Sequence, residues 1–398
     1  MSMISVEEAL SLINKESFFL KKEENLLVSE CLGRILAKPI VAPINLPSFR
    51  QSVMDGYALC LNDSNQYQVI GEIKAGDSPN LTLKPGKCVR IYTGAAVPEM
   101  ANAVVMQEKI SVKEDYIQIN EIPSLNHNIR EIGSQIKAGD ISLEAGQILN
   151  AAGLGFIQSL GIEKLNVYSS LKVSIIVTGN ELIPAGQKLE EGKIYESNSL
   201  LLQAALEHFE IKNVTIKKVE DRLDATVSAI DNAIKESNIV IVSGGISVGD
   251  YDFVGKAMEK LSVDQVFYKV RQRPGKPLFF GIKKETYLFA LPGNPASTLS
   301  CFYVYVVPLI KKLQGADGKG LSRFQLPITH RFSTKEPRAL FLKAYIEKQR
   351  VTILDHQNSS MLISFAKSNA LVYIPETKKE YLENELVETL ILPHVTIP

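Results

Sequence analysis

The second half of the chain repeats one pattern: a continuous apolar run ends in a glycine turn, and an amphipathic helix follows. Examples are VSIIVTG at 173–179, IVIVSGG at 239–245 and ALPG at 290–293. A strand that is apolar on both sides must be covered on both sides, and strands that alternate with helices usually pair in parallel. The pattern predicts an α/β fold with a doubly wound, mostly parallel sheet.

Periodicity predicts the remaining elements. We expect helices over 6–14, 23–37, 199–209, 224–235, 253–261 and 295–313, and strands over 214–219 and 265–270. Between 43 and 140, short apolar runs alternate with Gly and Pro, which is typical of a β-rich region. It contains Ile-Lys-Ala-Gly-Asp at 73–77 and 136–140, which we interpret as two similar β-turns. The residues from about 322 also form a strand-rich region, expected to be a small β domain.

Composition excludes several classes of protein. The chain has 44 basic and 44 acidic residues, so a general nucleic-acid binder is not expected, since phosphate contacts need surplus Lys and Arg. It has no apolar run of about 18 residues, and its start lacks the features of a signal peptide, so no membrane association is expected. Four scattered cysteines suit a reducing cytoplasm, and five unclustered histidines argue against a zinc hydrolase.

The glycine-bearing loops should meet at the carboxyl edge of the sheet, where open α/β sheets bind ligands. SGGISVGDYD at 243–252 brings Gly244, Gly245 and Gly249 before a helix, an arrangement that favours an anion such as phosphate. Asp250 and Asp252 add carboxylates, and carboxylate with phosphate indicates Mg²⁺. Capping of the following helix is the alternative role for these aspartates, of equal weight for Asp252.

Two further loops and a basic segment belong to the same edge. TGNEL at 178–182 offers Glu181 as a metal ligand or proton-transfer group, and LPGNPAS at 291–297 is a stiff strand-to-helix joint. KVRQRPGKP at 269–277 carries Lys276 on a turn, from which it can reach an oxyanion. The ordinary interpretation of the other basic residues is a solvated strand face. Together these loops predict a phosphate-and-metal pocket for a nucleotide or phosphorylated cofactor.

Together, these motifs resemble the molybdopterin-binding domain. LPSFRQSVMDGYA at 46–58, RIYTGAAVPEMANAVVMQE at 90–108 and NIREIGSQIKAGD at 128–140 resemble the preceding domains of molybdopterin molybdenumtransferases, the MoeA type that includes the gephyrin E domain. The resemblance covers essentially the whole chain, and Met-Asp-Gly-Tyr-Ala is its most specific motif.

The resemblance implies four domains and an elongated homodimer. The domains are an α/β molybdopterin-binding domain (1–22 and 171–316), an elongated linker or dimerisation domain (23–45 and 141–170), a β-rich domain (46–140) and a C-terminal β-barrel-like domain (317–398). The active cleft would lie where one subunit's α/β domain meets the partner's β-rich domain. The implied reaction inserts molybdenum from molybdate into adenylylated molybdopterin and releases AMP with Mg²⁺. Other molybdenum-cofactor synthesis proteins are further implied partners.

The resemblance also assigns roles by motif position. Catalytic roles are implied for Asp55, Glu181, Asp221, Asp252 and Lys276, with Asp55, Glu181 and Asp252 as metal ligands. Cofactor-binding roles are expected for Thr93, Gly244, Gly245, Ser247, Gly249, Asp250, Arg273, Pro292, Asn294 and Pro295, with molybdate at Ser297, Arg338 and Ser359 or Ser360. Without the resemblance, helix capping is the better interpretation of Asp221, and a surface role is an equal one for Arg338.

Three departures from the family pattern favour an alternative function. Arg50 and Gln51 stand where Asp and Asn are usual, Gln135 replaces a carboxylate, and Asn180 stands in place of Asp. An amide cannot act as a base and binds metals weakly. The alternative is a catalytically weakened paralogue that acts as a dimeric molybdopterin-binding or scaffold protein. A nucleotide-pyrophosphate hydrolase would leave Met-Asp-Gly-Tyr-Ala unused. The sequence does not distinguish molybdenum from tungsten.

Overall fold

The computed structural model describes residues 3–18, 20, 22–78, 81–246, 253–315 and 318–393. The chain forms two compact units, one made of residues 1–22 and 168–398 and the other of 23–167. The glycine loops belong to the first unit and Met-Asp-Gly-Tyr-Ala to the second. Within the described ranges, no helix is both long and apolar enough to cross a membrane.

The central sheet of the first unit has six strands in the order β16-β13-β17-β21-β20-β18. They are β13 Lys172–Thr178, β16 Asn213–Val219, β17 Ile239–Ser243, β18 Asp264–Tyr268, β20 Phe279–Lys283 and β21 Thr286–Leu291. Pairing is parallel from β16 to β21, but β20 is antiparallel to both β21 and β18. The sheet is therefore mixed, because a tight turn between β20 and β21 reverses the chain.

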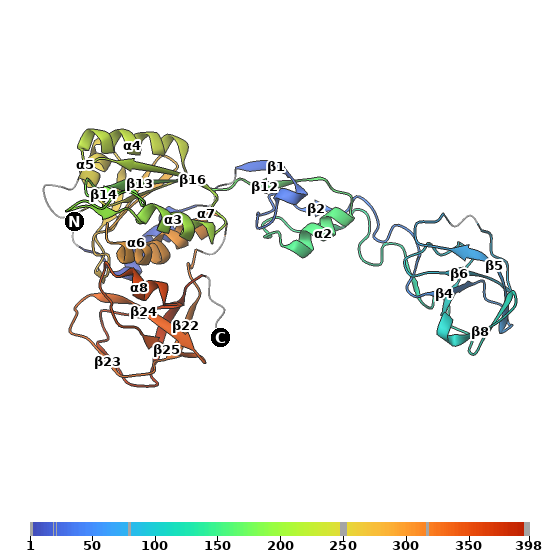
Figure 1. Ribbon diagram of the computed structural model, residues 1–398. Helices are drawn as coiled ribbons and strands as arrows, with labels where there is room; N and C mark the ends of the chain where they lie inside the picture. Colours follow the sequence, from blue (N-terminus) through green and yellow to red (C-terminus); the bar gives the residue numbers. More distant parts are fainter. Residues whose placement is uncertain are drawn as a thin grey trace. The chain divides into compact units, whose positions relative to one another are not determined.

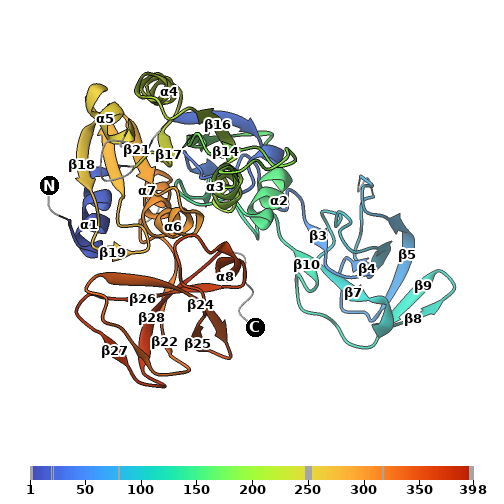
Figure 2. The same ribbon diagram turned by 60° about the vertical axis from the view of Figure 1, so that its left-hand side comes forward.

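Helices cover both faces of this sheet, as the continuous apolar strands predicted (Figures 1 and 2). They are α1 Val6–Glu16, α3 Asn198–Glu207, α4 Leu223–Glu236, α5 Phe253–Lys260, α6 Pro295–Cys301 and α7 Val307–Leu313. Successive residues of β13 serve opposite cores: Ile175 and Val177 pack with α3 and α7, whereas Ile176 packs with α4 and α5. The helix predicted over 295–313 contains a π-helical segment, η3 Phe302–Val306.

The strand-rich region after residue 321 is confirmed. It contains β22 Arg323–Pro327, β23 Phe332–Ser333, β24 Ala339–Glu347, β25 Arg350–Ile353, α8 Leu362–Ala366, β26 Ala370–Ile374, β27 Glu380–Tyr381 and β28 Leu386–Ile391. One sheet has the order β19-β24-β26-β28-β22, with β25 on β24. Because β19 Gln272–Arg273 comes from the basic segment and pairs with β24, it links this sheet to the α/β region.

The second unit is mostly strands. They are β1 Glu23–Leu27, β2 Ile40–Val41, β3 Gln51–Ser52, β4 Gly56–Leu59, β5 Gln66–Ile73, β6 Lys87–Ile91, β7 Ala103–Met106, β8 Ile110–Lys113, β9 Tyr116–Ile119, β10 Ile129–Arg130, β11 Ile141–Leu143 and β12 Lys164–Tyr168. The short helices are η1 Val28–Glu30, η2 Gln107–Lys109 and α2 Ala151–Ser159. A six-stranded sheet has the order β7-β4-β6-β5-β9-β8.

The helix predicted over 23–37 is wrong. Residues 23–27 form β1, whose side chains alternate in exposure, and a 3₁₀ turn follows. β1 pairs with β12, more than 130 residues further on, and Val28 N–H donates to Glu163 O at 2.9 Å. The spacing of the leucines suited a helix, but pairing with a distant strand overrides such a local preference.

The two Ile-Lys-Ala-Gly-Asp segments are similar turns, as predicted. Gly76 and Gly139 both have a φ of +93°. In each turn the Asp carboxylate accepts a hydrogen bond from the Lys backbone N–H, at 2.8 Å for Asp77 and 3.2 Å for Asp140.

Candidate functional site

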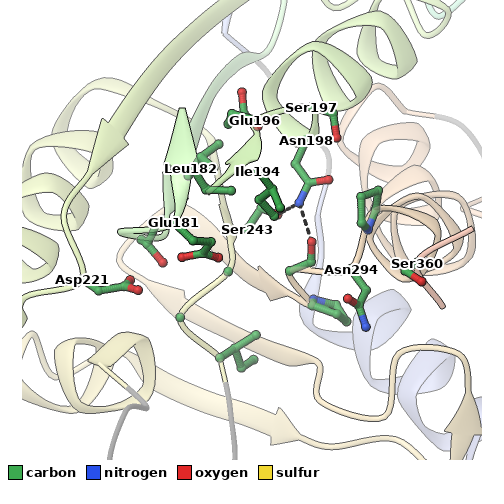
Figure 3. Close-up of a pocket in the computed structure, with 18 of the residues that line it drawn as sticks. Glu181, Leu182, Ile194, Glu196, Ser197, Asn198, Asp221, Ser243, Asn294 and Ser360 are labelled. Atoms are coloured by element: carbon green, nitrogen blue, oxygen red, sulfur yellow. Dashed lines mark hydrogen bonds between the residues drawn. The ribbon is translucent and has the colours of Figure 1, made fainter. Parts of the chain in front are cut away.

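A cavity of about 560 Å³ lies at the carboxyl ends of β13, β17 and β21, within the usual range of ligand pockets. Its walls include eight residues expected from the sequence: Glu181, Asp221, Gly244, Gly245, Pro292, Asn294, Pro295 and Ser360. Further walls come from β14 Leu182–Ile183, β15 Ile194–Tyr195 and the start of α3. The prediction that the glycine loops meet at this edge is confirmed (Figure 3).

Close backbone approach explains the glycine at the end of β17. Gly244 has a φ of +90°, and a Cβ there would lie 2.4 Å from the carbonyl oxygen of Thr178, the last residue of the neighbouring strand β13. Only glycine satisfies both conditions without strain. At Gly244 the cavity is therefore lined by backbone atoms alone.

Asn198 connects the end of β17 to the loop after β21 by two hydrogen bonds. The sequence did not indicate this role. Its Nδ2 donates to Ser243 Oγ at 2.9 Å and to Gly293 O at 2.8 Å, as drawn in Figure 3. Asn198 is 8% exposed. In the sequence, Asn198 precedes the apolar residues of α3. A polar residue is common at the start of a helix, so its type and position gave no sign of a further role.

Several polar atoms of the cavity have no protein partner. Among the described residues, five buried side-chain atoms lack a hydrogen bond, and three of them belong to cavity residues: Thr178 Oγ1, Asn198 Oδ1 and Asp221 Oδ1. Buried polar atoms are almost always paired in a folded protein. Their concentration here indicates that a polar ligand completes the site.

Two carboxylates, Glu181 and Asp221, define an acidic end (Figure 3). Neither carboxylate is paired with a basic side chain of the described chain, whereas Asn180 Oδ1 holds the Asp221 backbone N–H at 3.2 Å. Helix capping is the wrong interpretation of Asp221, because the N-cap of α4 is Arg222 and no side chain caps that helix. The acidic end can hold a cation.

A magnesium ion fits this end in part. Mg²⁺ takes one or two protein carboxylates and fills its remaining positions with phosphate and water oxygens. Glu181 and Asp221 meet that requirement, although no group of three His, Cys, Asp or Glu side chains that could hold a metal occurs in the described part of the chain. Of the other two expected ligands, Asp55 belongs to the second unit and Asp252 lies outside the described residues.

One carboxylate, that of Glu336, holds two arginines that the sequence assigned to the site. Glu336 accepts from Arg338 at 2.7 and 3.0 Å and from Arg273 at 3.3 Å. The Arg338 guanidinium lowers the pKa of Glu336 to about 2. Arg338 is thus not a free surface arginine. Glu336 is a functional candidate that the sequence did not suggest, because acidic residues between basic ones are common on surfaces.

The Lys276 turn borders the cavity. Pro277 lines it, and Lys276 O accepts from Val270 N–H at 3.0 Å. Below the turn, the buried Gln272 Nε2 donates to Gly275 O at 3.0 Å, and Tyr305 Oη donates to Gln272 Oε1. Neither Lys276 nor Arg273 lines the cavity itself.

The far end of the cavity carries amide and hydroxyl groups. Asn294 Nδ2 donates to Ser359 Oγ at 3.0 Å, and Ser297 N–H donates to Ser359 O at 3.2 Å. Ser360 lines the cavity beside Asn294 (Figure 3), whereas Ser297 is buried beneath. The C-terminal region therefore contributes one wall.

Asp55 and Thr93 form a separate pair in the second unit. Asp55 Oδ1 accepts from the Thr93 backbone N–H at 2.8 Å and from Thr93 Oγ1 at 2.7 Å. These hydrogen bonds hold the pKa of Asp55 below its ordinary value. The next residue must be glycine, because a Cβ on Gly56 would lie 1.9 Å from Val105 O.

Four expected site residues, Ser247, Gly249, Asp250 and Asp252, lie outside the described residues. Of the departures, Gln135 is exposed in the second unit. Arg50 donates to Glu99 O at 3.3 Å and to Asn126 Oδ1 at 3.4 Å, so it braces a loop.

Comparison with known proteins covers nearly the whole chain. Residues 4–161 match the MoeA N-terminal region (domain I and II), 174–312 a probable molybdopterin binding domain, and 325–392 the MoeA C-terminal region (domain IV). The molybdopterin molybdenumtransferase of Haemophilus influenzae is 36% identical over 396 residues, which cover 97% of this chain and 98% of that protein. Its counterpart from Staphylococcus epidermidis is 32% identical over 400 residues, covering 98% and 95%.

Solved structures agree with the sequence relatives. A molybdopterin biosynthesis MoeA protein from Pyrococcus horikoshii has a TM-score of 0.83 and 28% identity, over 98% of this chain and 99% of that one. It shares the multidomain architecture. The chain therefore belongs to the family of molybdopterin molybdenumtransferases.

Proposed function

We propose that this protein inserts molybdenum from molybdate into the dithiolene of adenylylated molybdopterin and releases AMP. The observation that carries the proposal is the cavity at the strand ends, with unpartnered Thr178 Oγ1, Asn198 Oδ1 and Asp221 Oδ1 in the region that matches the molybdopterin-binding model. The names of the relatives support the same reaction. The free polar atoms would bind and orient the substrate.

The acidic end would bind Mg²⁺ together with the phosphates of the substrate. When bound, the cation would neutralise the developing charge as the phosphoanhydride bond breaks. Glu181 and Asp221 would hold it, with Asp252 and the partner subunit's Asp55 as the further proposed ligands. Asn180 would keep Asp221 in place through its backbone N–H.

The Asn294 and Ser360 end would bind molybdate. Hydroxyl and amide donors suit an oxyanion, and the arginines held by Glu336 would add positive charge nearby. Lys276 and Ser297 complete the proposed set. The zero net charge of the chain does not oppose this, because the basic groups are concentrated locally.

We also propose four domains with the boundaries given above, a cytoplasmic location, which the four free thiols support, and a homodimer. The partner subunit's Asp55 and the partner subunit's Thr93 would serve the cavity of the first subunit. Mixing inactive Asp55→Asn and Glu181→Gln chains tests this arrangement. Random exchange leaves one intact site in half of the dimers, so activity should recover to about a quarter of wild type. No recovery would contradict a shared site.

The decisive assay combines purified protein with adenylylated molybdopterin, Mg²⁺ and molybdate. AMP release and active cofactor are expected. If neither appears but calorimetry shows tight pterin binding, the weakened paralogue that Gln135, Asn180 and Arg50 suggest becomes the better function. Recovery of turnover in Gln135→Asp would then identify the lost carboxylate.

A further inference from the structure

One lysine of the C-terminal sheet is buried. Lys343 lies in β24 between apolar neighbours and is 3% exposed. It forms no ion pair with a carboxylate in the described chain, and burial lowers its pKa. An ammonium group is unfavourable in such a place unless its donors are satisfied.

Three backbone carbonyls satisfy it, and all come from the loop of residues 355–361. Nζ donates to His356 O at 2.9 Å, Asn358 O at 3.2 Å and Met361 O at 3.3 Å. Three acceptors match the three N–H donors of the charged form. The Gln357 amide adds two bonds to the Lys343 backbone, at 2.9 and 2.8 Å. Residues 355–361 thus surround the ammonium group of Lys343.

The same loop forms the Ser360 wall of the cavity. Ser359 accepts from Asn294 Nδ2 and from Ser297 N–H, and Ser360 lines the cavity (Figure 3). In a trans peptide the N–H points away from the carbonyl. Because Asn358 O points at Nζ, the Ser359 N–H points the other way, and it donates to no group of the described chain. A cation on one side of the loop and a donor without a partner in the described chain on the other side both favour an anion.

We propose that Lys343 is a positioning residue that fixes loop 355–361 for oxyanion binding at the Asn294 and Ser360 end. It rests on the proposed function, since molybdate is the oxyanion assigned to that end. Lys343 touches no substrate in this scheme. It acts through Ser359 and Ser360, and its charge adds to the local potential because it is poorly screened inside the protein.

Three substitutions in the full-length protein test the proposal. Lys343→Gln removes the charge but keeps two donors, Lys343→Arg restores the charge, and Lys367→Gln removes an exposed lysine of the same region as a control. We expect Lys343→Gln to raise the KM for molybdate about tenfold, with kcat and the affinity for adenylylated molybdopterin within about twofold. Lys343→Arg should recover most of the loss, and Lys367→Gln should change nothing.

Hydrogen exchange separates this proposal from the proposed function. Amides of 357–362 should exchange faster in Lys343→Gln, and sodium molybdate should bind it more weakly in calorimetry, even if wild type shows no turnover. Unchanged molybdate binding in folded Lys343→Gln would overturn the positioning role. If that variant does not fold, Gln357→Leu loosens the same loop, and an unchanged KM for molybdate there would overturn it equally.

Discussion

The acidic and basic groups assigned to the proposed site differ in whether other groups of the protein bind them. At the acidic end, Glu181 and Asp221 have carboxylates without a basic partner in the described chain. Three basic groups are held instead: Arg273 and Arg338 by Glu336, and Lys343 by three carbonyls. Free carboxylates can take up a cation that arrives with the substrate. Held cations stay in position. Arg273 and Arg338 keep further N–H donors for an oxyanion, whereas Lys343 contributes its charge alone. The difference indicates that the acidic end binds a cation that arrives with the substrate, whereas the basic groups provide positive charge at fixed positions.

The largest effect is expected at Gly244, because the cavity wall that it forms supports both the acidic end and the oxyanion-binding end. Gly244→Ala forces a Cβ to within 2.4 Å of Thr178 O at a φ of +90°. The free energy of unfolding should fall by about 2–4 kcal/mol, and AMP release should fall to background. Thermal unfolding measures the loss of stability, and the assay with adenylylated molybdopterin, Mg²⁺ and molybdate measures AMP release.

Gly186→Ala is the matched control. Gly186 has a φ of +89°, but a Cβ there meets nothing within 4 Å. If it destabilises as much as Gly244→Ala, backbone conformation rather than the collision with Thr178 is the cause.

The second test removes a free carboxylate. Glu181→Gln should lower kcat about a hundredfold and raise the Mg²⁺ concentration needed for half-maximal rate. Glu196→Gln changes a carboxylate of the same cavity that already accepts from Ser199 N–H at 2.8 Å, so it should lose little activity. Equal losses in the two variants would remove the distinction between free and held carboxylates.

The third test concerns the held arginines. The pKa of Glu336 is lowered from 4.5 to about 2, so its ion pairs stabilise the fold above pH 4.5 and are lost as pH falls toward 2. Wild type should therefore lose more stability between pH 5 and pH 3 than Glu336→Gln, by a few degrees in Tm. Parallel Tm curves across this range would show that the pair contributes nothing.

The smallest effect is expected in the second unit. Thr93→Val removes one of two donors to Asp55 and keeps the backbone N–H. The pKa of Asp55 should rise partway to its ordinary value, which carboxyl NMR titration can follow. Such a rise would show that hydrogen bonds from neutral donors lower the pKa of Asp55. No change would assign the lowered pKa to the backbone N–H alone.

The sequence by itself determined the α/β elements, the glycine loops and their meeting place, because continuous apolar strands and turn glycines act through local chemistry. Tertiary structure decided the strand pairing of residues 23–27, the antiparallel edge at β18 and β20, and the roles of Asn198, Glu336 and Lys343. The β1 pairing, the Asn198 contacts and the Glu336–Arg273 pair join residues far apart in the chain, and the Lys343 contacts depend on how the loop after β25 folds back. A lysine within an apolar strand looks like a solvent-facing residue until the loop that surrounds it is known.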